Sequence, residues 1–268
     1  MQASTAPIVN RGFERLALIA SSAPRAQDAA AALRDSGGWV SLAECDAVVV
    51  LGGDGTMLDA MHQMIDEGLE RPAYGLNVGT VGFLMNRYHR QVRLRERLAQ
   101  ARPIAVAPLR MEAVTQAGEV HSFFAVNEVS LLRETRQTAK IEISVNDRVR
   151  IPELACDGVL LSTPVGSTAY NLSANGPILP LDSQMLALTP ISPFRPRRWK
   201  GAILPDRNRV TFRVLEPGKR PVAAVADQRE VRNVAEVRLA IARERQLTLL
   251  FDPGHALDER IVAEQFAH

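Results

Sequence analysis

The sequence predicts two domains of different class, an α/β domain followed by a mainly antiparallel β domain. Strand-like and helix-like patterns alternate up to residue 102. Beyond Pro103 helical periodicity disappears, and strand-like segments recur at short spacing between turn residues. A strand-like and a helix-like segment at the end predict that the C-terminus packs back on the first domain. The expected divisions are 13–102, 103–245 and 246–268.

The segments of the first domain alternate between strand and helix patterns. Apolar runs predict strands at Leu16–Ala20, Ala47–Leu51 and Ala73–Asn77. Helical spacing predicts helices at Pro24–Asp35, Met57–Ile65 and Gln91–Ala101. Because strands alternate with helices, we expect a parallel, Rossmann-like sheet with its ligand site at the carboxyl ends of the strands.

The second domain is predicted from short apolar segments that turn residues separate. Its expected strands are Leu109–Thr115, Ser122–Val129, Lys140–Val145, Gly158–Ser162, Arg209–Val214 and Glu236–Ala242. The returning segment is expected to form a strand at Gln246–Phe251 and a helix at Asp258–Phe266.

The composition of the 268-residue chain limits its class. Apolar residues make up 46% and charged residues 23%, which is typical of a soluble globular protein. The formal net charge of +2 is too small to indicate a nucleic-acid-binding protein. Without an apolar run of membrane-spanning length or a secretory signal in residues 1–12, we expect a cytoplasmic protein that does not bind membranes. Cys45, Cys156 and the scattered histidines lack metal-ligand spacing, so we assign no protein metal ligand.

The first glycine turn, Gly52-Gly53-Asp54-Gly55-Thr56, follows a buried strand and precedes a helix that we expect to begin near Thr56. Backbone N–H groups at a helix N-terminus bind anions, most naturally phosphates. A loop that only holds phosphate has no use for the carboxylate of Asp54, so we expect Asp54 to meet a proton or a hydroxyl group. The alternative is a tight turn in which Asp54 caps the helix.

Two further segments indicate a polar ligand. Residues 157–177 combine small, hydroxylated and glycine positions with Tyr170, which can stack on a ring. Asn127-Glu128 ends an apolar run and can hold ribose hydroxyls or base edges, although such a pair is more often a turn.

These motifs, in this order and spacing, resemble the NAD kinase family. They are Gly-Gly-Asp-Gly-Thr at 52–56, Asn127-Glu128, Asp157-Gly158 and the block from Thr163 to Tyr170 that continues into Leu172-Ser173-Ala174. The first motif also occurs in lipid kinases, whereas the block from Thr163 is far more specific. The resemblance spans about Leu16 to Phe251.

The resemblance implies an enzyme that phosphorylates the 2′-hydroxyl of the adenosine ribose of NAD, with NAD bound between the two domains. Asp54 matches the proton acceptor, Asp157 a residue near the nicotinamide side, and 168–173 the block around the adenine. The NAD- and phosphate-binding residues implied are Gly53, Asp54, Gly55, Phe83, Asn127, Glu128, Asp157, Val165, Thr168, Ala169, Tyr170, Asn171, Leu172 and Ser173. ATP is the implied donor, with a divalent cation, Mg²⁺, carried on its phosphates. The resemblance also implies a homodimer or homotetramer.

Three positions depart from the family pattern. Val165 stands where threonine is usual, Ala155 where several relatives carry a basic residue, and Asn175 where glycine is common. The sequence leaves open whether polyphosphate also serves as donor, whether NADH is accepted and whether NADP(H) feeds back. A lipid kinase and a non-catalytic NAD-binding module stay as alternatives. The basic segment Phe194–Lys200 is either a polyanion-binding patch or a structured loop.

Overall fold

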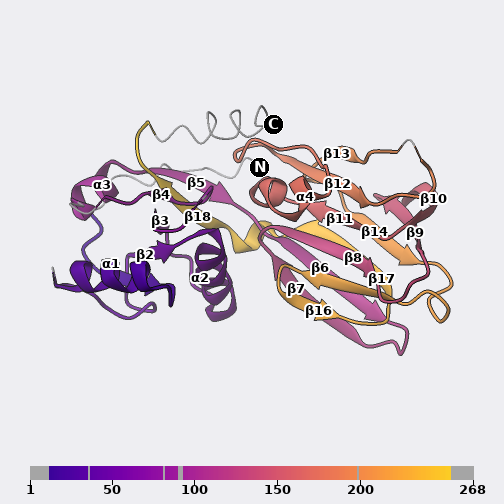
Figure 1. Cartoon of the computed structure of the whole chain (residues 1–268), viewed down its shortest axis with the longest axis horizontal. Coiled ribbons are helices and arrows are strands. Elements are labelled where there is room, and N and C mark those ends of the chain that lie inside the picture. Colours follow the sequence, from indigo (N-terminus) through magenta and orange to yellow (C-terminus); the bar gives the residue numbers. More distant parts are fainter. Residues whose placement is uncertain (1–11, 36, 81, 90–92, 198, 255–268) are drawn as a thin grey trace. The chain divides into compact units, whose positions relative to one another are not determined.

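The computed structural model describes residues 12–35, 37–80, 82–89, 93–197 and 199–254, which form two compact units (Figure 1). The first unit contains the described residues up to Val106 together with the strand that begins at Leu247. The second unit runs from Ala107 to Gln246. Each unit has an apolar core of its own.

The first unit is built on a six-stranded mixed sheet. Its strands are β1 (Leu16–Ala20), β2 (Ala47–Gly52), β3 (Ala73–Asn77), β4 (Asn86–Arg87), β5 (Arg102–Val106) and β18 (Leu247–Phe251). The order is β1-β2-β3-β18-β5, and β4 pairs with the end of β3. Strands β1, β2, β3 and β18 run parallel to one another, whereas β5 is antiparallel to β18. The expectation of a purely parallel sheet was therefore wrong at β5.

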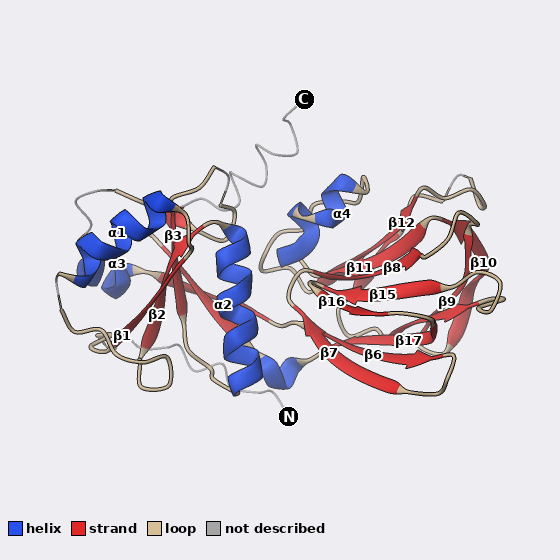
Figure 2. Cartoon of the chain, turned by 60° about the horizontal axis from the view of Figure 1, so that its bottom comes forward, coloured by secondary structure: helices blue, strands red, loops and turns tan. Residues whose placement is uncertain are grey.

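Within the described residues three helices flank this sheet, namely α1 (Pro24–Arg34), α2 (Asp54–Glu67) and α3 (Leu94–Gln100). Figure 2 shows α1 and α3 on one face and α2 on the other. Leu33 of α1 and Leu98 of α3 accordingly belong to one apolar cluster with Val49 of β2. Helix α2 begins at Asp54 rather than near Thr56, so the predicted start was too late. No helix in the described part of the chain is long and apolar enough to span a membrane.

The second unit consists of two six-stranded antiparallel sheets packed face to face (Figure 2). One sheet has the order β10-β9-β14-β17-β6-β7 and the other β13-β12-β11-β8-β15-β16. The strands of the first are β6 (Leu109–Thr115), β7 (Val120–Ala125), β9 (Ala139–Val145), β10 (Arg148–Cys156), β14 (Val210–Val214) and β17 (Val234–Ile241). Those of the second are β8 (Glu128–Arg133), β11 (Gly158–Ser162), β12 (Met185–Ile191), β13 (Ala202–Pro205), β15 (Val222–Ala226) and β16 (Arg229–Val231). One shared apolar cluster fills the space between the sheets.

The predicted strand Ser122–Val129 is wrong, because two strands occupy this stretch. Strand β7 ends at Ala125 and β8 begins at Glu128, so the chain crosses from one sheet to the other at Val126 and Asn127. An apolar run gives no sign of such a crossing, because both flanking strands contribute to one core.

The sequence reading also missed several strands, among them β5, β10, β12, β13, β15 and β16. β10 pairs with β9 through two register shifts and contains Pro152, so its apolar alternation is interrupted. The helix expected at Asp258–Phe266 lies outside the described residues.

Candidate functional site

The glycine turn after β2 combines a tight packing contact with an open backbone surface. A Cβ atom on Gly52 would lie 2.2 Å from Oγ1 of Thr56, so only glycine fits there. A Cβ atom added at Gly53 or Gly55, in contrast, would have no atom of the described residues within 4 Å. Both glycines lie at the N-terminus of α2, where backbone N–H groups lack helical partners. This surface lets a ligand approach the backbone closely.

Asp54 points its carboxylate at a second turn. Its Oδ2 accepts a hydrogen bond from the backbone N–H of Phe83 at 2.9 Å, and its Oδ1 accepts one from that of Leu84 at 2.8 Å. The N-cap of α2 is Gly53, so the alternative in which Asp54 serves only to cap the helix is wrong. Each carboxylate oxygen carries two lone pairs, so Asp54 can still accept a hydroxyl proton.

The second turn follows β3 and folds onto the side chain of Asn77. Oδ1 of Asn77 accepts a hydrogen bond from the N–H of Gly79 at 2.9 Å. Gly82 has φ of 71°, and a Cβ atom there would lie 2.4 Å from Nδ2 of Asn77. The backbone at residue 82 thus requires glycine. The next two residues, Phe83 and Leu84, carry the N–H groups that donate to Asp54.

In the second unit, the start of β8 meets the segment that follows β11. The backbone N–H of Thr163 donates to the carbonyl of Asn127 at 2.9 Å, and its hydroxyl donates to that of Val126 at 2.6 Å. A Cβ atom on Gly166 would lie 2.2 Å from the Asn127 carbonyl oxygen. The absence of a side chain at Gly166 therefore brings Asn127-Glu128 against the loop that we predicted to bind NAD.

Asp227, which the sequence reading missed, organises the start of β8. Its carboxylate accepts hydrogen bonds from the backbone N–H groups of Val126, Asn127 and Glu128 at 2.6, 3.0 and 3.1 Å. Asp227 lies in the turn between β15 and β16 with φ of 51°, a conformation that aspartate tolerates better than most residues. The only available signal was a turn-forming residue between two short apolar segments.

The environment of Glu128 favours the protonated form of its carboxyl group. Burial, and then the negative charge of Asp227, raise the pKa of Glu128 to about 8. Its Oε2 is buried and has no hydrogen-bond partner among the described residues. Burial, followed by the charges of Glu128 and Asp157, also raises the pKa of Tyr170. The charges of Glu128 and Asp157 thus act on Tyr170, and a protonated Glu128 can donate a hydrogen bond.

Asp157 is fixed by an ion pair at the start of β11. Its Oδ1 accepts a hydrogen bond from Nε of Arg133 at 2.6 Å, and the same guanidinium donates to the carbonyl of Thr135. The side chain of Asp157 remains 40% exposed. Asp157 is thus oriented yet open to a ligand.

The loop after β11 folds into a 3₁₀ turn (Val165–Thr168) and the short helix α4 (Tyr170–Ser173). Asn171 is buried, and its amide donates to the carbonyls of Ser167 and Pro177 and accepts from the Thr189 hydroxyl at 2.7 Å. Its side chain therefore stabilises the loop. Val165 is also buried, Thr168, Ala169, Tyr170 and Leu172 are half-buried, and Ser173 is exposed.

Two departures from the family pattern have structural explanations. Asn175 adopts φ of 60°, in the left-handed region. Asparagine tolerates this conformation better than most residues, so it can replace glycine here. Ala155 is 6% exposed, and its backbone binds the basic segment through hydrogen bonds with Phe194 and Arg195.

The described residues of the basic segment, 194–197, 199 and 200, lie in the connection between β12 and β13. The Phe194 ring is 50% exposed, and the guanidinium groups of Arg195 and Arg197 lie 5.6 and 5.5 Å from its centroid. No carboxylate of the described residues pairs with either arginine. Trp199 packs against the core of the unit. These contacts agree with a structured loop, and the polyanion-binding patch stays an alternative prediction.

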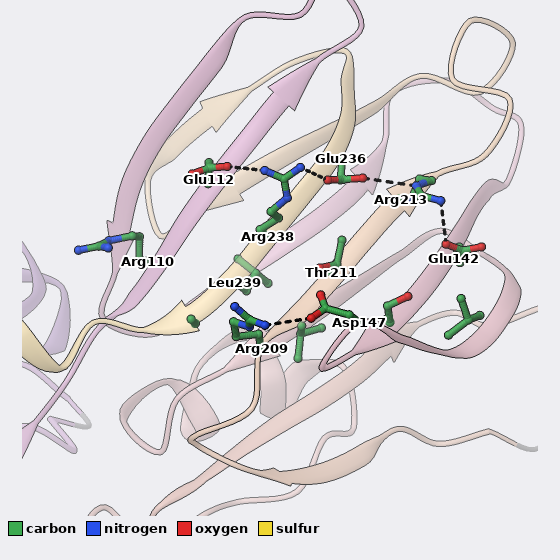
Figure 3. A pocket seen from close by; sticks show the side chains of 14 residues that line it. Arg110, Glu112, Glu142, Asp147, Arg209, Thr211, Arg213, Glu236, Arg238 and Leu239 are labelled. Atoms are coloured by element: carbon green, nitrogen blue, oxygen red, sulfur yellow. Dashed lines mark hydrogen bonds and ion pairs between the residues drawn. The ribbon is translucent and has the colours of Figure 1, made fainter.

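A pocket of about 510 Å³ lies on the charged face of the sheet that contains β9, β14 and β17 (Figure 3). Arg238 bridges Glu112 and Glu236, while Arg213 bridges Glu236 and Glu142. The predicted site residues, all within the described part of the chain, do not line this pocket. Its charges neutralise one another, so it is unlike a site that binds phosphate.

Comparison with known proteins identifies the family. Residues 26–99 match the family model of the ATP-NAD kinase N-terminal domain, and residues 126–248 match that of the ATP-NAD kinase C-terminal domain. The NAD kinase of Rhizorhabdus wittichii is 61% identical over 254 residues, which cover 95% of this chain and 98% of the relative. The chain belongs to the NAD kinase family. The NAD kinase of Zymomonas mobilis is 57% identical over the same coverage.

Solved structures of NAD kinases share the fold. A yeast NADH kinase complexed with NADH has a TM-score of 0.79 and 18% identity, with 95% of this chain and 87% of that chain covered. An NAD kinase from Archaeoglobus fulgidus in complex with ATP has a TM-score of 0.74 and 22% identity, with 93% and 97% covered. At these identities the likeness concerns the fold. Membership in the NAD kinase family disfavours the lipid-kinase alternative that the first glycine turn left open.

Proposed function

We propose that this protein transfers the terminal phosphoryl group of ATP to the 2′-hydroxyl of the adenosine ribose of NAD, which yields NADP and ADP. Membership in the NAD kinase family supports the reaction. The observation that carries the mechanism is the Asp54 carboxylate, which two backbone N–H groups orient beside an open glycine backbone.

Asp54 would act as the proton acceptor. The 2′-hydroxyl donates a hydrogen bond to a free lone pair of the carboxylate, which aligns the hydroxyl oxygen with the γ-phosphorus. The new O–P bond forms as the bond from the γ-phosphorus to the bridging oxygen of ADP breaks, and the hydroxyl proton passes to Asp54. Because the transition state is loose, orientation matters more than the strength of the base.

The donor phosphates would lie against Gly53 and Gly55 at the N-terminus of α2. Backbone N–H groups there can donate to phosphate oxygens, and the helix dipole favours their negative charge. The described residues contain no cluster of three or more His, Cys, Asp or Glu side chains that could hold a metal ion. A divalent cation, which we expect to be Mg²⁺, would thus take most ligands from phosphates and water, and it would neutralise charge on the transferred group.

NAD would also contact residues of the second unit. We assign contacts to Phe83 of the first unit and to Asn127, Glu128, Asp157 and the segment 165–173 of the second. Protonated Glu128 supports this assignment, because it can donate a hydrogen bond to an acceptor on the nucleotide. For the buried Asn171, the contact would come from the backbone, since its side-chain amide is occupied within the loop.

The remaining expectations concern the whole protein. The order β1, α1, β2, α2, β3 supports a Rossmann-like assignment for the first unit. We also propose that the protein is cytoplasmic and that it forms a homodimer or a homotetramer. Sedimentation of the purified protein would measure its oligomeric state.

The deciding experiment is an assay of the purified protein with NAD, ATP and Mg²⁺, in which an NADP-specific dehydrogenase reports product. Wild type should form NADP, whereas Asp54→Asn should lose about 100-fold or more of the turnover and still bind NAD. Parallel reactions with polyphosphate and with NADH define the donor and acceptor ranges. If NAD binds and no donor yields product, the non-catalytic module replaces the enzyme. Unchanged turnover in Asp54→Asn would remove Asp54 from the mechanism.

A further inference from the structure

The backbone that orients Asp54 is continuous with a short strand, β4, that pairs with the end of β3 in the first sheet. Phe83 and Leu84, which donate to the Asp54 carboxylate, lie immediately before Met85 and β4. Two hydrogen bonds to two oxygens determine both the position and the plane of a carboxylate. Any displacement of the backbone at 83–84 therefore moves the carboxylate as well.

Asn86, the first residue of β4, restrains this backbone through side-chain hydrogen bonds. β4 pairs with β3 over two residues only, so the ladder by itself is a weak restraint. The Asn86 side chain is fully buried and donates to the carbonyl oxygens of Gly75 at 3.1 Å and Leu250 at 2.9 Å. Its own Oδ1 accepts from the backbone N–H of Asp252 at 2.8 Å. One side chain thus connects β3, β4 and the end of β18, which are neighbours in Figure 1.

The Asp252 carboxylate extends the same network. Its Oδ1 accepts from the Tyr74 hydroxyl at 2.6 Å and from Nε of Arg97 at 3.2 Å, and its Oδ2 accepts from Nη2 of Arg97. Arg97 in turn donates to the carbonyl of Arg87 at 2.9 Å. The Arg97 and Asp252 side chains are 18% and 20% exposed, so these charge-assisted bonds are largely shielded from water.

Both residues of β4 therefore depend on Asp252. Asn86 is bound by the backbone N–H of Asp252, and Arg87 is bound through Arg97, which the Asp252 carboxylate holds. Burial and the hydrogen bond to Asp252 raise the pKa of Tyr74, so its hydroxyl stays protonated as a donor.

We propose that Asp252 and Asn86 are positioning residues for phosphoryl transfer, because they fix the backbone that orients Asp54. The inference rests on the proposed function and extends it to the end of the C-terminal strand. A displacement of about 1 Å in a reacting group can cost about 100-fold in rate. Loss of one restraint in this network should cost less, about tenfold.

The first test compares Asp252→Asn with the matched control Asp46→Asn. Asp46 also lies in the first unit and also accepts from a backbone N–H and a guanidinium, both of Arg15, but it does not touch the turn at 82–87. Asp252→Asn should lower kcat about tenfold and leave KM for NAD and ATP within about twofold. Asp46→Asn should keep the wild-type kcat. Rates are measured well below the melting temperature of each variant, so that unfolded protein does not account for the loss.

A folded Asp252→Asn variant with the wild-type kcat would overturn the proposal. If that variant does not fold, Tyr74→Phe takes its place, since it removes a single hydroxyl donor to Asp252 and preserves the ring. A wild-type kcat in Tyr74→Phe would then count against the proposal in the same way.

Amide hydrogen exchange separates this proposal from the proposed function. The N–H groups of Phe83 and Leu84 should exchange about tenfold faster in Asp252→Asn than in Asp46→Asn. Equal exchange in the two variants would exclude the positioning role. If wild type forms no NADP, the proposed function fails, while the exchange data still decide whether Asp252 holds the backbone around Asp54.

Discussion

The carboxylate of Asp227 accepts a hydrogen bond from the backbone N–H of Glu128 at 3.1 Å, while its negative charge acts on the side chain of the same residue. The Asp227 carboxylate accepts hydrogen bonds from backbone N–H groups, whereas Oε2 of Glu128 is buried without a hydrogen-bond partner among the described residues. When two acids share such a site, the less solvated one holds its proton. One carboxylate therefore organises the backbone, and the other remains a neutral donor.

This arrangement predicts a pH dependence of stability. In the unfolded chain Glu128 releases its proton near 4.5, whereas in the folded protein its pKa is about 8. Between these values the folded state binds more protons, so the free energy of unfolding falls as pH rises through this window. The contribution is fully present below the lower value and lost above the higher one. Each pKa unit corresponds to about 1.4 kcal/mol, so the fall is on the order of a few kcal/mol.

Urea unfolding at about pH 5 and about pH 9 measures this effect. Glu128→Gln should flatten the profile, because glutamine does not titrate. The control is Glu119→Gln, which removes a carboxylate that is 71% exposed and should leave the profile unchanged. Parallel profiles for wild type and Glu128→Gln would contradict the assignment of the raised pKa.

Gly55→Ala should separate activity from stability. The new methyl group meets open space among the described residues, and alanine is favoured over glycine in a helix by up to about 1 kcal/mol. The free energy of unfolding should therefore stay constant or rise. If donor phosphates approach this backbone, kcat/KM for ATP should fall about tenfold. Gly218→Ala, also in open space, is the control for both measurements, and wild-type kinetics in Gly55→Ala would place the phosphates elsewhere.

Gly166→Ala should disturb the second unit. Its methyl group would lie 2.2 Å from the carbonyl oxygen and 2.6 Å from the Cα atom of Asn127, so a backbone segment must move. We expect a loss of about 1–3 kcal/mol in the free energy of unfolding. NAD affinity measured by calorimetry should fall as well, because Asn127 and Glu128 shift. Wild-type stability and affinity together would show that this close approach is dispensable.

Thr189→Val should destabilise the loop after β11. Valine keeps the shape of threonine but leaves Oδ1 of buried Asn171 without its hydroxyl donor. An unsatisfied buried acceptor costs about 1–3 kcal/mol, which urea unfolding would resolve. The control is Thr211→Val, because Thr211 of β14 is only half-buried. This substitution should change the free energy of unfolding much less. Equal effects of the two substitutions would refute the role of the Asn171–Thr189 pair.

Continuous local patterns made much of the fold predictable. Strands β1, β3, β6 and β11 have the predicted bounds, because each is a continuous apolar run or, in β6, a regular alternation of apolar and polar residues. β10 was missed because two register shifts and Pro152 break its alternation. The antiparallel direction of β5 could not be predicted from the local sequence either, because β5 pairs with β18, which lies far along the chain.

The sequence by itself determined that a buried strand enters a glycine turn with a carboxylate at its centre, because strand burial and glycine conformations are local properties. Only the tertiary structure decided what that carboxylate binds, since its N–H donors lie 29 and 30 residues away. The same holds for the proton on Glu128, whose neighbour Asp227 is 99 residues distant. A pKa and a hydrogen-bond geometry depend on burial and on charges brought together by folding, and no local pattern records them.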